Sequence, residues 1–254
     1  MIFKRAIVKL PPKTFPTGLV APDSDPADYN LAVKQHANYI KALQACGLEV
    51  IPMKPDDAFP DSTFVEDAAL ITPHCAVITN PGATTRKGEI ITMQKVLGKY
   101  FEQIEAIHDP GTLEAGDIMM VGHHYYIGLS ERTNPEGAAQ LITILNNYGM
   151  TGSTVPLKKV LHLKSGVSYL ENNNMVVAGE FIENEVFNKF NLIRIPDEET
   201  YAANCIWVNG TVLLPKGYPA TTRLIQAAGY PTIELEVSEF RKMNGGLSCL
   251  SLRF

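Results

Sequence analysis

The sequence predicts an α/β protein in which five small, related units pack around a common axis. Apolar hairpin patterns recur along the chain, and each is followed by a helical pattern and a further strand pattern. This alternation of strands and helices is typical of the α/β class. Units with so few strands cannot bury their apolar faces alone, so they should pack against one another. We therefore expect residues 1–254 to form a single domain.

Each unit begins with an anchor residue that precedes a short apolar strand. Successive anchors are 37 to 51 residues apart, which is a loose period of about 45 residues. In the fourth unit the turn Asn209-Gly210 between two apolar runs is the strongest short hairpin signal. If the units are related by rotation, the anchors should point toward the axis and form a polar pocket. The five anchors are Asp67, Asp117, Ser168, Cys205 and Cys249.

The fifth unit has only one strand of its hairpin after Cys249. The apolar run Arg5–Leu10 near the start of the chain is the natural second strand of this hairpin. Pairing between these two segments would close the five units into a ring. It would also cover a sheet edge that is otherwise exposed.

Helical periodicity occupies the stretch between each hairpin and the last strand of its unit. Glycines at or just after the end of three of these stretches favour helix termination there. The expected helices are Tyr29–Cys46, Gly88–Phe101, Asn134–Asn147, Asn184–Lys189 and Pro219–Gly229. The strands expected to follow them are Leu48–Met53, Ile104–His108, Val155–Lys158, Leu192–Ile195 and Thr232–Val237.

Composition and charge exclude several classes of protein. The net charge of −5 provides no broad basic surface, so nucleic acid is not an expected partner. No apolar run approaches the roughly 18 residues of a membrane span, and no signal-peptide pattern precedes the first strand. The four cysteines match no zinc or CxxC pattern, so we expect reduced thiols in a cytoplasmic protein. The sequence leaves the oligomeric state open, with a homodimer as one option.

Three groups of residues are candidates for chemistry. Cys249 follows the pair Gly245-Gly246, which allows a close approach of the backbone, and it is either a nucleophile or a small buried residue. His162 alternates with leucines and is either a hydrogen-bonded strand histidine or an acid–base group. Acidic clusters around Asp67 and Asp117 are caps or solvated strand starts, unless they face a polar cavity or a cationic ligand.

Four motifs together carry a family resemblance. They are Phe64-Val-Glu-Asp67, Leu113-Glu-Ala-Gly-Asp117, His162-Leu-Lys-Ser-Gly166 and Gly245-Gly-Leu-Ser-Cys249, in this order. The chain resembles the dimethylarginine dimethylaminohydrolase family of guanidine-modifying enzymes over essentially its whole length. The resemblance implies a five-bladed α/β propeller, the pentein fold. It also implies cysteine-dependent hydrolysis of a non-peptide C–N bond in a free arginine-derived amino acid, without a metal ion or an organic cofactor.

The resemblance implies catalytic roles for four residues. Cys249 would attack the central carbon of a guanidino or ureido group and form a covalent adduct. His162 would protonate the leaving amine and then help to activate water, and Glu114 would orient His162. Asp67 would hold the substrate nitrogens beside the reacting carbon.

Further positions match the family's substrate-binding residues. Arg86 and Arg132 resemble its carboxylate-binding arginines, one of which can bind bidentately. The Leu19 carbonyl and Asp61 resemble its contacts to the α-amino group. The remaining residues expected to bind or support the substrate are Phe64, Glu66 and Asn244.

Asn244 departs from the family pattern, which commonly has aspartate at this position. A guanidinium group offers only donors, whereas the ureido group of citrulline also offers a carbonyl acceptor to an asparagine amide. We therefore expect hydrolysis of citrulline to ornithine, carbon dioxide and ammonia. The alternative is hydrolysis of dimethylarginine to citrulline and dimethylamine. Two other classes stay open: a non-catalytic amino-acid-binding module, and an amidinotransferase that passes the adduct to an amine.

Overall fold

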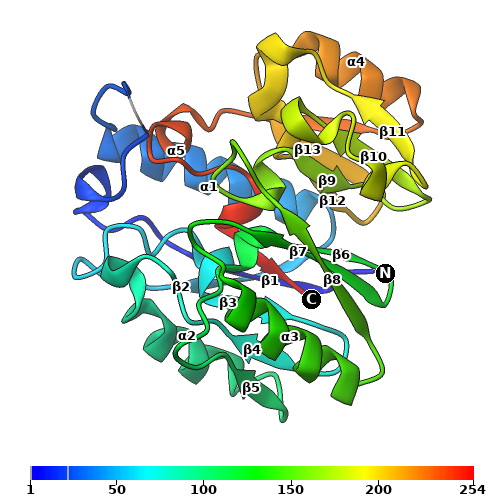
Figure 1. Cartoon of the computed structure of the whole chain (residues 1–254). Helices are drawn as coiled ribbons and strands as arrows, with labels where there is room; N and C mark the ends of the chain where they lie inside the picture. The colour runs from blue at the N-terminus through cyan, green and yellow to red at the C-terminus, as the bar shows by residue number, and fades with distance from the viewer. Residues whose placement is uncertain (1, 22) are drawn as a thin grey trace.

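The structure is a computed structural model that describes residues 2–21 and 23–254 (Figure 1). Its strands form five three-stranded sheets. In every sheet the middle strand pairs antiparallel with one neighbour and parallel with the other. The same hairpin-and-returning-strand unit therefore occurs five times, and the predicted five-bladed α/β propeller is confirmed.

The first four blades follow one another along the chain. Each uses three consecutive strands in sequence order. They are β3 (Ala69–Ile71), β4 (Ala76–Ile78) and β5 (Ile104–Ala106); β6 (Ile118–Val121), β7 (His124–Leu129) and β8 (Thr151–Pro156); β9 (Val167–Tyr169), β10 (Asn174–Val177) and β11 (Asn191–Arg194); and β12 (Ile206–Val208), β13 (Thr211–Pro215) and β14 (Thr232–Leu235).

The fifth blade joins strands from opposite ends of the sequence. It consists of β15 (Leu252–Arg253), β1 (Arg5–Lys9) and β2 (Glu49–Met53). β1 lies in the middle, antiparallel to β15 and parallel to β2. The predicted closure of the ring by the N-terminal strand is confirmed, and both paired segments can be followed in Figure 1.

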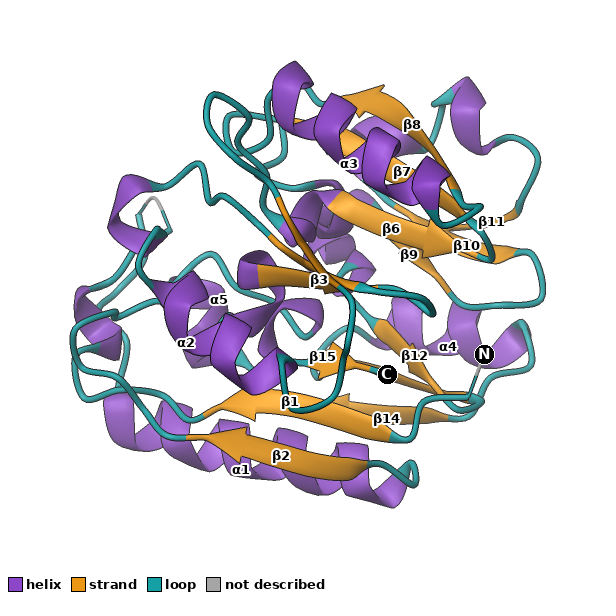
Figure 2. Cartoon of the chain, turned by 90° about the horizontal axis from the view of Figure 1, so that it is seen from below, coloured by secondary structure: helices purple, strands orange, loops and turns teal. Residues whose placement is uncertain are grey.

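Helices cover the outside of the blades. In Figure 2, α1 and α3 lie on opposite outer sides of the molecule with strands between them. α1 (Tyr29–Ala45) and α3 (Pro135–Asn147) each begin after a side-chain cap, supplied by Asp28 and Asn134. The other helices are α2 (Glu89–Leu97), α4 (Pro219–Ala227) and the short α5 (Ser238–Lys242). None of the helices in the described ranges has the length and apolar character of a membrane span.

Two predicted elements differ from the structure. The helix expected at Asn184–Lys189 is a single 3-10 turn, Glu185–Phe187, where the Asn184 side chain accepts a hydrogen bond from Val186 N. Such a local side-chain contact competes with helical hydrogen bonding. The strand expected at Val155–Lys158 is β8, whose six residues from Thr151 onward pair in register with β7. The first residues of β8 are small and polar, so an apolar pattern does not reveal them. The other helices and strands agree with the expected ranges to within a few residues.

A 3-10 turn precedes the first strand of every blade. The first strands of all five blades line one cavity on the axis, which we call the axial cavity. The turns are Val65–Ala68, Ala115–Asp117, Leu163–Ser165, Asp197–Ala203 and Ser248–Leu250. Further 3-10 turns elsewhere are Phe15–Thr17, Thr84–Arg86 and Gly179–Phe181.

Buried polar contacts connect consecutive blades around the axis. In each contact, a side chain of one blade bonds the backbone of the next. The contacts are Asp67 Oδ1 with Gly116 N (3.0 Å), Asp117 Oδ1 with Leu163 N (3.0 Å), Ser168 Oγ with Cys205 O (2.8 Å) and Asn204 Oδ1 with Ser248 N (2.9 Å). Ser248 Oγ closes this circuit by donating to Glu66 Oε2 at 2.7 Å. Three of the five anchors, Asp67, Asp117 and Ser168, therefore join neighbouring blades, and the residues directly before Cys205 and Cys249 make the corresponding contacts in the last two units.

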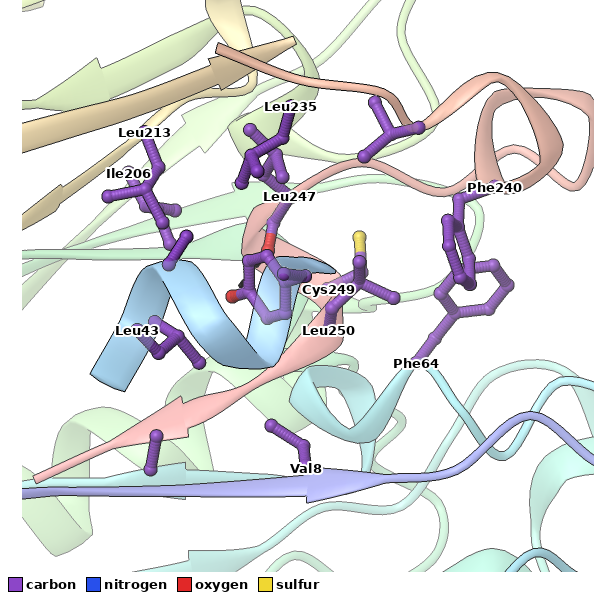
Figure 3. Packing of buried hydrophobic residues seen from close by; sticks show 14 of the residues in the cluster. Val8, Leu43, Phe64, Ile206, Leu213, Leu235, Phe240, Leu247, Cys249 and Leu250 are labelled. Carbon is purple, nitrogen blue, oxygen red and sulfur yellow. Dashed lines mark hydrogen bonds between the residues drawn. The ribbon is translucent and has the colours of Figure 1, made fainter. Parts of the chain in front are cut away.

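An apolar cluster supports the turn that carries Cys249. The cluster lies between α1, α5 and strands of the fourth and fifth blades. Figure 3 shows Cys249 beside Leu247 and Leu250 and near the rings of Phe64 and Phe240. Burial of each such side chain contributes about 1.5–3 kcal/mol. Apolar packing around Leu247, Cys249 and Leu250 therefore holds the backbone of the turn in place.

His36 in α1 is a buried histidine among aromatic rings. Its ring centroid lies 6.4 Å from that of Tyr39 and 6.1 Å from that of Phe240. Within the described part of the chain, neither ring nitrogen has a hydrogen-bond partner. Burial disfavours the imidazolium ion and lowers the pKa of His36 from 6.5 to about 4.

We predict that His36 destabilises the fold in acid. Because the unfolded chain titrates near pH 6.5, it gains a proton before the folded chain does as the pH falls. The stability contributed by neutral His36 is complete above this pH and is lost as the pH approaches 4, by about 3 kcal/mol. Urea unfolding at pH 7 and pH 4 would measure this loss. His36→Phe should remove that part of the pH dependence, and an unchanged pH dependence in the variant would contradict the assignment.

Candidate active site

Two adjoining cavities meet at Cys249. The narrower one, which we call the substrate cavity, is lined by ten of the eleven residues that the sequence predicts for the site. They are Leu19, Asp61, Phe64, Asp67, Arg86, Glu114, Arg132, His162, Asn244 and Cys249. The wider side cavity has a volume of about 260 Å³ and includes Lys164, Tyr201 and Asn204 in its lining. Residues from widely separated motifs thus converge on one thiol.

Two glycines allow the Cys249 turn to reach this position. A Cβ atom on Gly245 would lie 2.1 Å from the Phe64 ring, and one on Gly246 would lie 2.4 Å from the Asn204 side chain. The carbonyl of Gly245 accepts a hydrogen bond from Tyr201 Oη at 2.9 Å. The glycine pair is therefore required by close packing, as the sequence indicated.

The protein groups around Cys249 keep its thiol neutral at pH 7. Its side chain is buried, and burial together with the charges of Glu66 and Asp67 raises the pKa of Cys249 to about 12. The ammonium group of Lys164 opposes this shift but does not reverse it. Cys249 consequently needs an added positive charge, or an acceptor for its proton, before it can act as a thiolate.

His162 and Glu114 form a buried pair in the lining of the substrate cavity. His162 Nε2 lies 2.9 Å from Glu114 Oε2. Burial alone would lower the pKa of His162, but the charges of Asp67 and Asp117 and the hydrogen bond to Glu114 raise it to about 9. His162 is therefore an imidazolium ion at neutral pH and is ready to donate a proton.

Asp67 is held between two blades and an arginine. Asp67 Oδ1 accepts a hydrogen bond from Gly116 N at 3.0 Å, and Arg86 Nη1 donates to Asp67 Oδ2 at 2.6 Å. Burial disfavours the carboxylate, but the charges of His162 and Arg86 outweigh it and lower the pKa of Asp67. Asp67 is therefore ionised beside Cys249.

The two arginines predicted to bind a carboxylate have different surroundings. Arg86 is buried and also donates to Glu89 at 2.8 Å and to the Phe64 carbonyl at 2.9 Å. Arg132 is partly exposed, and its ion pair with Glu114 is longer, at 3.8 Å. Arg132 is thus the more available of the two for an incoming anion, whereas Arg86 holds Asp67 in place.

Leu19, Asp61 and Asn244 all line the substrate cavity, and Leu19 contacts the other two. Leu19 N donates to Asp61 Oδ1 at 3.0 Å, and Asn244 Nδ2 lies 3.5 Å from the Leu19 carbonyl. The second Asp61 oxygen and the Leu19 carbonyl provide acceptors near each other. The backbone of Asn244 has φ +58°, in the left-handed region that asparagine, aspartate and glycine adopt most readily.

Glu66 is the one predicted residue outside the substrate cavity. Its carboxylate lies at the axial cavity, where it pairs with Lys164 Nζ at 2.5 Å and accepts from Ser248 Oγ. Consecutive residues of a 3-10 turn point in different directions, so Glu66 and its neighbour Asp67 face different spaces. Glu66 thus lines the axial cavity and not the substrate cavity, and its contact with a substrate stays a prediction.

Sequence reasoning did not identify several residues that shape the site. Lys164 and Ser248 belong to motifs already quoted, so their adjacency to His162 and Cys249 was an available signal. Glu89 follows Arg86 at the i+3 spacing of a helical ion pair, which was also readable. Asn204 comes from a different blade and had no recognisable pattern.

Asp67, Glu114 and His162 also have the composition of a metal site. One ligand atom from each lies within 4.8 Å of the others. Each is already engaged, because Asp67 binds Arg86 and Gly116 while Glu114 binds His162. The close approach of these three groups is explained by the ion pairs among them and by the protonated imidazole.

We predict that Cys249 reacts slowly with iodoacetamide at neutral pH. Because burial and acidic neighbours raise its pKa to about 12, the alkylation rate should keep increasing above pH 9. Mass spectrometry of the Cys249 peptide against time and pH measures the rate, and a Cys249→Ser variant gives the background. A rate that reaches its plateau near pH 7 would instead indicate a preformed thiolate.

Comparisons with known proteins identify relatives of the chain. Residues 23–207 match a family model described as N,N dimethylarginine dimethylhydrolase, eukaryotic. The chain is 51% identical over 254 residues to N(G),N(G)-dimethylarginine dimethylaminohydrolase of Pseudomonas aeruginosa, with 100% of both proteins covered. It is 32% identical over 253 residues to the protein of the same name from Streptomyces coelicolor, covering 98% of this chain and 96% of that one. A solved structure of a serine-for-cysteine variant of the Pseudomonas enzyme with citrulline matches with a TM-score of 0.99 at 50% identity, over 100% of both chains.

Proposed function

The chain belongs to the dimethylarginine dimethylaminohydrolase family, and we propose that it hydrolyses a free Nω-methylated arginine to citrulline and a methylamine. It is thus a hydrolase of non-peptide C–N bonds, with a small arginine-derived amino acid as its substrate. The reaction proceeds through a covalent adduct on Cys249. The assignment of the methylated substrate goes beyond the family and is argued from the charges around the thiol.

The observation that carries this choice is that Cys249 and the Asp67 carboxylate line the same cavity, where the charge of Asp67 adds to the burial that raises the pKa of Cys249. Asp67 lies in the same cavity as Cys249, and its two carboxylate oxygens accept hydrogen bonds from Gly116 N and Arg86 Nη1. A guanidinium cation bound against Asp67 would bring a positive charge to the sulfur and lower the pKa of Cys249. The ureido group of citrulline is neutral and cannot do so. A cationic substrate therefore activates its own nucleophile.

The chemistry then follows from the positions of the thiol and the imidazolium. The Cys249 thiolate attacks the guanidinium carbon, which Asp67 holds by its nitrogens. His162 protonates the departing amine, and the resulting neutral imidazole takes a proton from the water that cleaves the adduct. Glu114 keeps the ring of His162 oriented throughout. Division into two steps lowers the barrier that the resonance-stabilised carbon presents.

The amino-acid end of the substrate meets a complementary group of charges. Arg132 is available for the α-carboxylate, while Asp61 and the Leu19 carbonyl provide acceptors for the α-ammonium group. A peptide-bound arginine lacks both free charges. These contacts therefore favour a free amino acid over an arginine side chain in a protein.

Citrulline hydrolysis, expected from Asn244, remains the second candidate but is not confirmed. The relatives carry the name of the methylarginine reaction, and citrulline is the product of that reaction. The left-handed backbone at position 244 suits asparagine and aspartate alike, so Asn244 has a structural explanation that does not involve the substrate. The specific observation that still favours citrulline is the absence of a carboxylate at this position.

We predict that dimethylarginine and monomethylarginine yield citrulline and the corresponding amine, and that citrulline yields no ornithine. Chromatographic detection of citrulline, ornithine and amines measures all three reactions. Asn244→Asp should raise kcat/KM for the methylated substrates by about tenfold, which corresponds to ~1.4 kcal/mol for an added charged contact.

Cys249→Ser serves as the matched control, because it should bind the substrate without turnover. Ornithine release from citrulline with no amine release from either methylated arginine would reverse the assignment. Ligand binding without any turnover by the unsubstituted protein would indicate a binding module. Transfer of the amidino group to an added amine would indicate an amidinotransferase.

A further inference from the structure

The proton of the Cys249 thiol has no evident acceptor among the groups discussed so far. His162 is already protonated, and its Nε2 is bound to Glu114 at 2.9 Å. Asp67 is engaged by Arg86 and Gly116. In the described part of the chain, the side-chain hydrogen-bond partner of Cys249 Sγ is Ser248 Oγ, at 3.9 Å. The thiol is thus adjacent to a hydroxyl group rather than to a free base.

The Ser248 hydroxyl is oriented by its other contacts. Its single proton is donated to Glu66 Oε2 at 2.7 Å. Asn204 holds Ser248 from two sides, since Asn204 Nδ2 donates to Ser248 Oγ at 3.1 Å and Asn204 Oδ1 accepts from Ser248 N at 2.9 Å. One lone pair of the hydroxyl oxygen is therefore left for the thiol. In this arrangement the Cys249 thiol can donate to Ser248 Oγ while Ser248 Oγ donates to Glu66 Oε2.

We propose that Ser248 and Glu66 form a proton relay that accepts the Cys249 proton during attack and returns it when the product leaves. This inference rests on the proposed function, because the relay operates on the thiol of the covalent mechanism. Ser248 is a catalytic residue in this scheme, since it contacts the reacting sulfur. Glu66 acts through Ser248 and is the terminal acceptor.

The protons balance over one turnover. In the first step the S–H bond of Cys249 breaks, Ser248 Oγ takes that proton, and its original proton passes to Glu66 Oε2. The departing amine receives a proton from His162, which recovers one from the attacking water. When the carbonyl of citrulline forms, the sulfur leaves as a thiolate and recovers its proton from Glu66 through Ser248. The hydroxyl proton of the collapsing adduct passes to solvent water, where the amine released in the earlier step takes it up, so the net products are citrulline and an ammonium ion.

Glu66 is placed to exchange charge without entering the substrate cavity. Its other oxygen pairs with Lys164 Nζ, and Lys164 lines both the axial cavity and the side cavity. Glu66 and Ser248 also line the axial cavity. The relay therefore ends at the axial cavity, whose lining does not include the amino-acid binding residues of the substrate cavity. Glu66 acts on the thiol from the axial cavity. The charged or titratable groups that line the two other cavities together with Cys249 are Asp61, Asp67, Arg86, Glu114, Arg132, His162, Lys164, Tyr201 and Arg241.

Glu66→Gln separates a relay from a purely electrostatic role. Removal of the negative charge near the sulfur makes the thiol more acidic, so iodoacetamide should alkylate Cys249 faster at pH 8 than in the unsubstituted protein. If Glu66 accepts the proton, formation of the substrate adduct should nevertheless become about 10²-fold slower, as expected for loss of a general base. Rapid-quench mass spectrometry with dimethylarginine measures adduct formation.

Ser248 variants test the middle of the relay. Ser248→Ala should slow adduct formation to a similar extent, Ser248→Thr should recover most of the rate, and the Ser248→Ala/Glu66→Gln double variant should be no slower than either single variant. Ser168→Ala is the matched control. It removes another buried serine hydroxyl that joins two blades, without contact to Cys249.

Two outcomes would overturn the relay. One is an adduct rate in Ser248→Ala equal to that of the unsubstituted protein. The other is a Glu66→Gln variant in which alkylation and adduct formation both accelerate, which would make Glu66 an inhibitory charge only. Failure of the proposed function is recognised separately, because then the unsubstituted protein itself forms no adduct with methylated arginines.

Discussion

The carboxylate of Asp67 is the group on which the architecture and the chemistry both depend. One oxygen bonds Gly116 in the second blade, and the other receives Arg86. The same charge helps to raise the pKa of His162 and of Cys249. Because Asp67 is buried, these interactions act in a medium where water screens them poorly. A single side chain thus joins two blades, helps to keep the imidazole charged, and adds to the effects of burial and of Glu66 that keep the thiol neutral.

The resting site combines a protonated imidazole with a protonated thiol. This arrangement differs from a preformed thiolate–imidazolium pair, in which the nucleophile is reactive at all times. A neutral thiol is less exposed to unspecific alkylation and oxidation, since the thiolate is the reactive form. Selectivity then resides in the charge of the ligand as much as in its shape. The long distance between Cys249 and Ser248 Oγ, compared with the short contacts beyond it, makes the first proton transfer the step that substrate binding has to promote.

The repeat was readable from the sequence because each blade places an apolar hairpin before a helix. The role of Arg5–Leu10 followed from the incomplete fifth hairpin, and β1 and β15 pair as expected. The register of β8 was not readable, since its first residues are small and polar and are positioned by pairing with β7. In the site, the family resemblance carried by the four motifs identified the lining residues, but the direction of Glu66 depends on the local twist of a 3-10 turn. The contacts of Asn204 depend on packing between the fourth and fifth blades, with Ser248 lying 44 residues further along the chain.

The separation of the substrate cavity from the axial cavity has a consequence for inhibition. Glu66, Lys164 and Ser248 stand between the binding residues for the amino acid and the space lined by the first strands. A small molecule in the axial cavity would therefore be able to bind while the substrate occupies the substrate cavity. Such a compound would lower the rate even at saturating substrate concentration. An arginine analogue in the substrate cavity would instead be displaced by excess substrate. The propeller thus has two chemically distinct cavities, and only the substrate cavity has a lining complementary to a free amino acid.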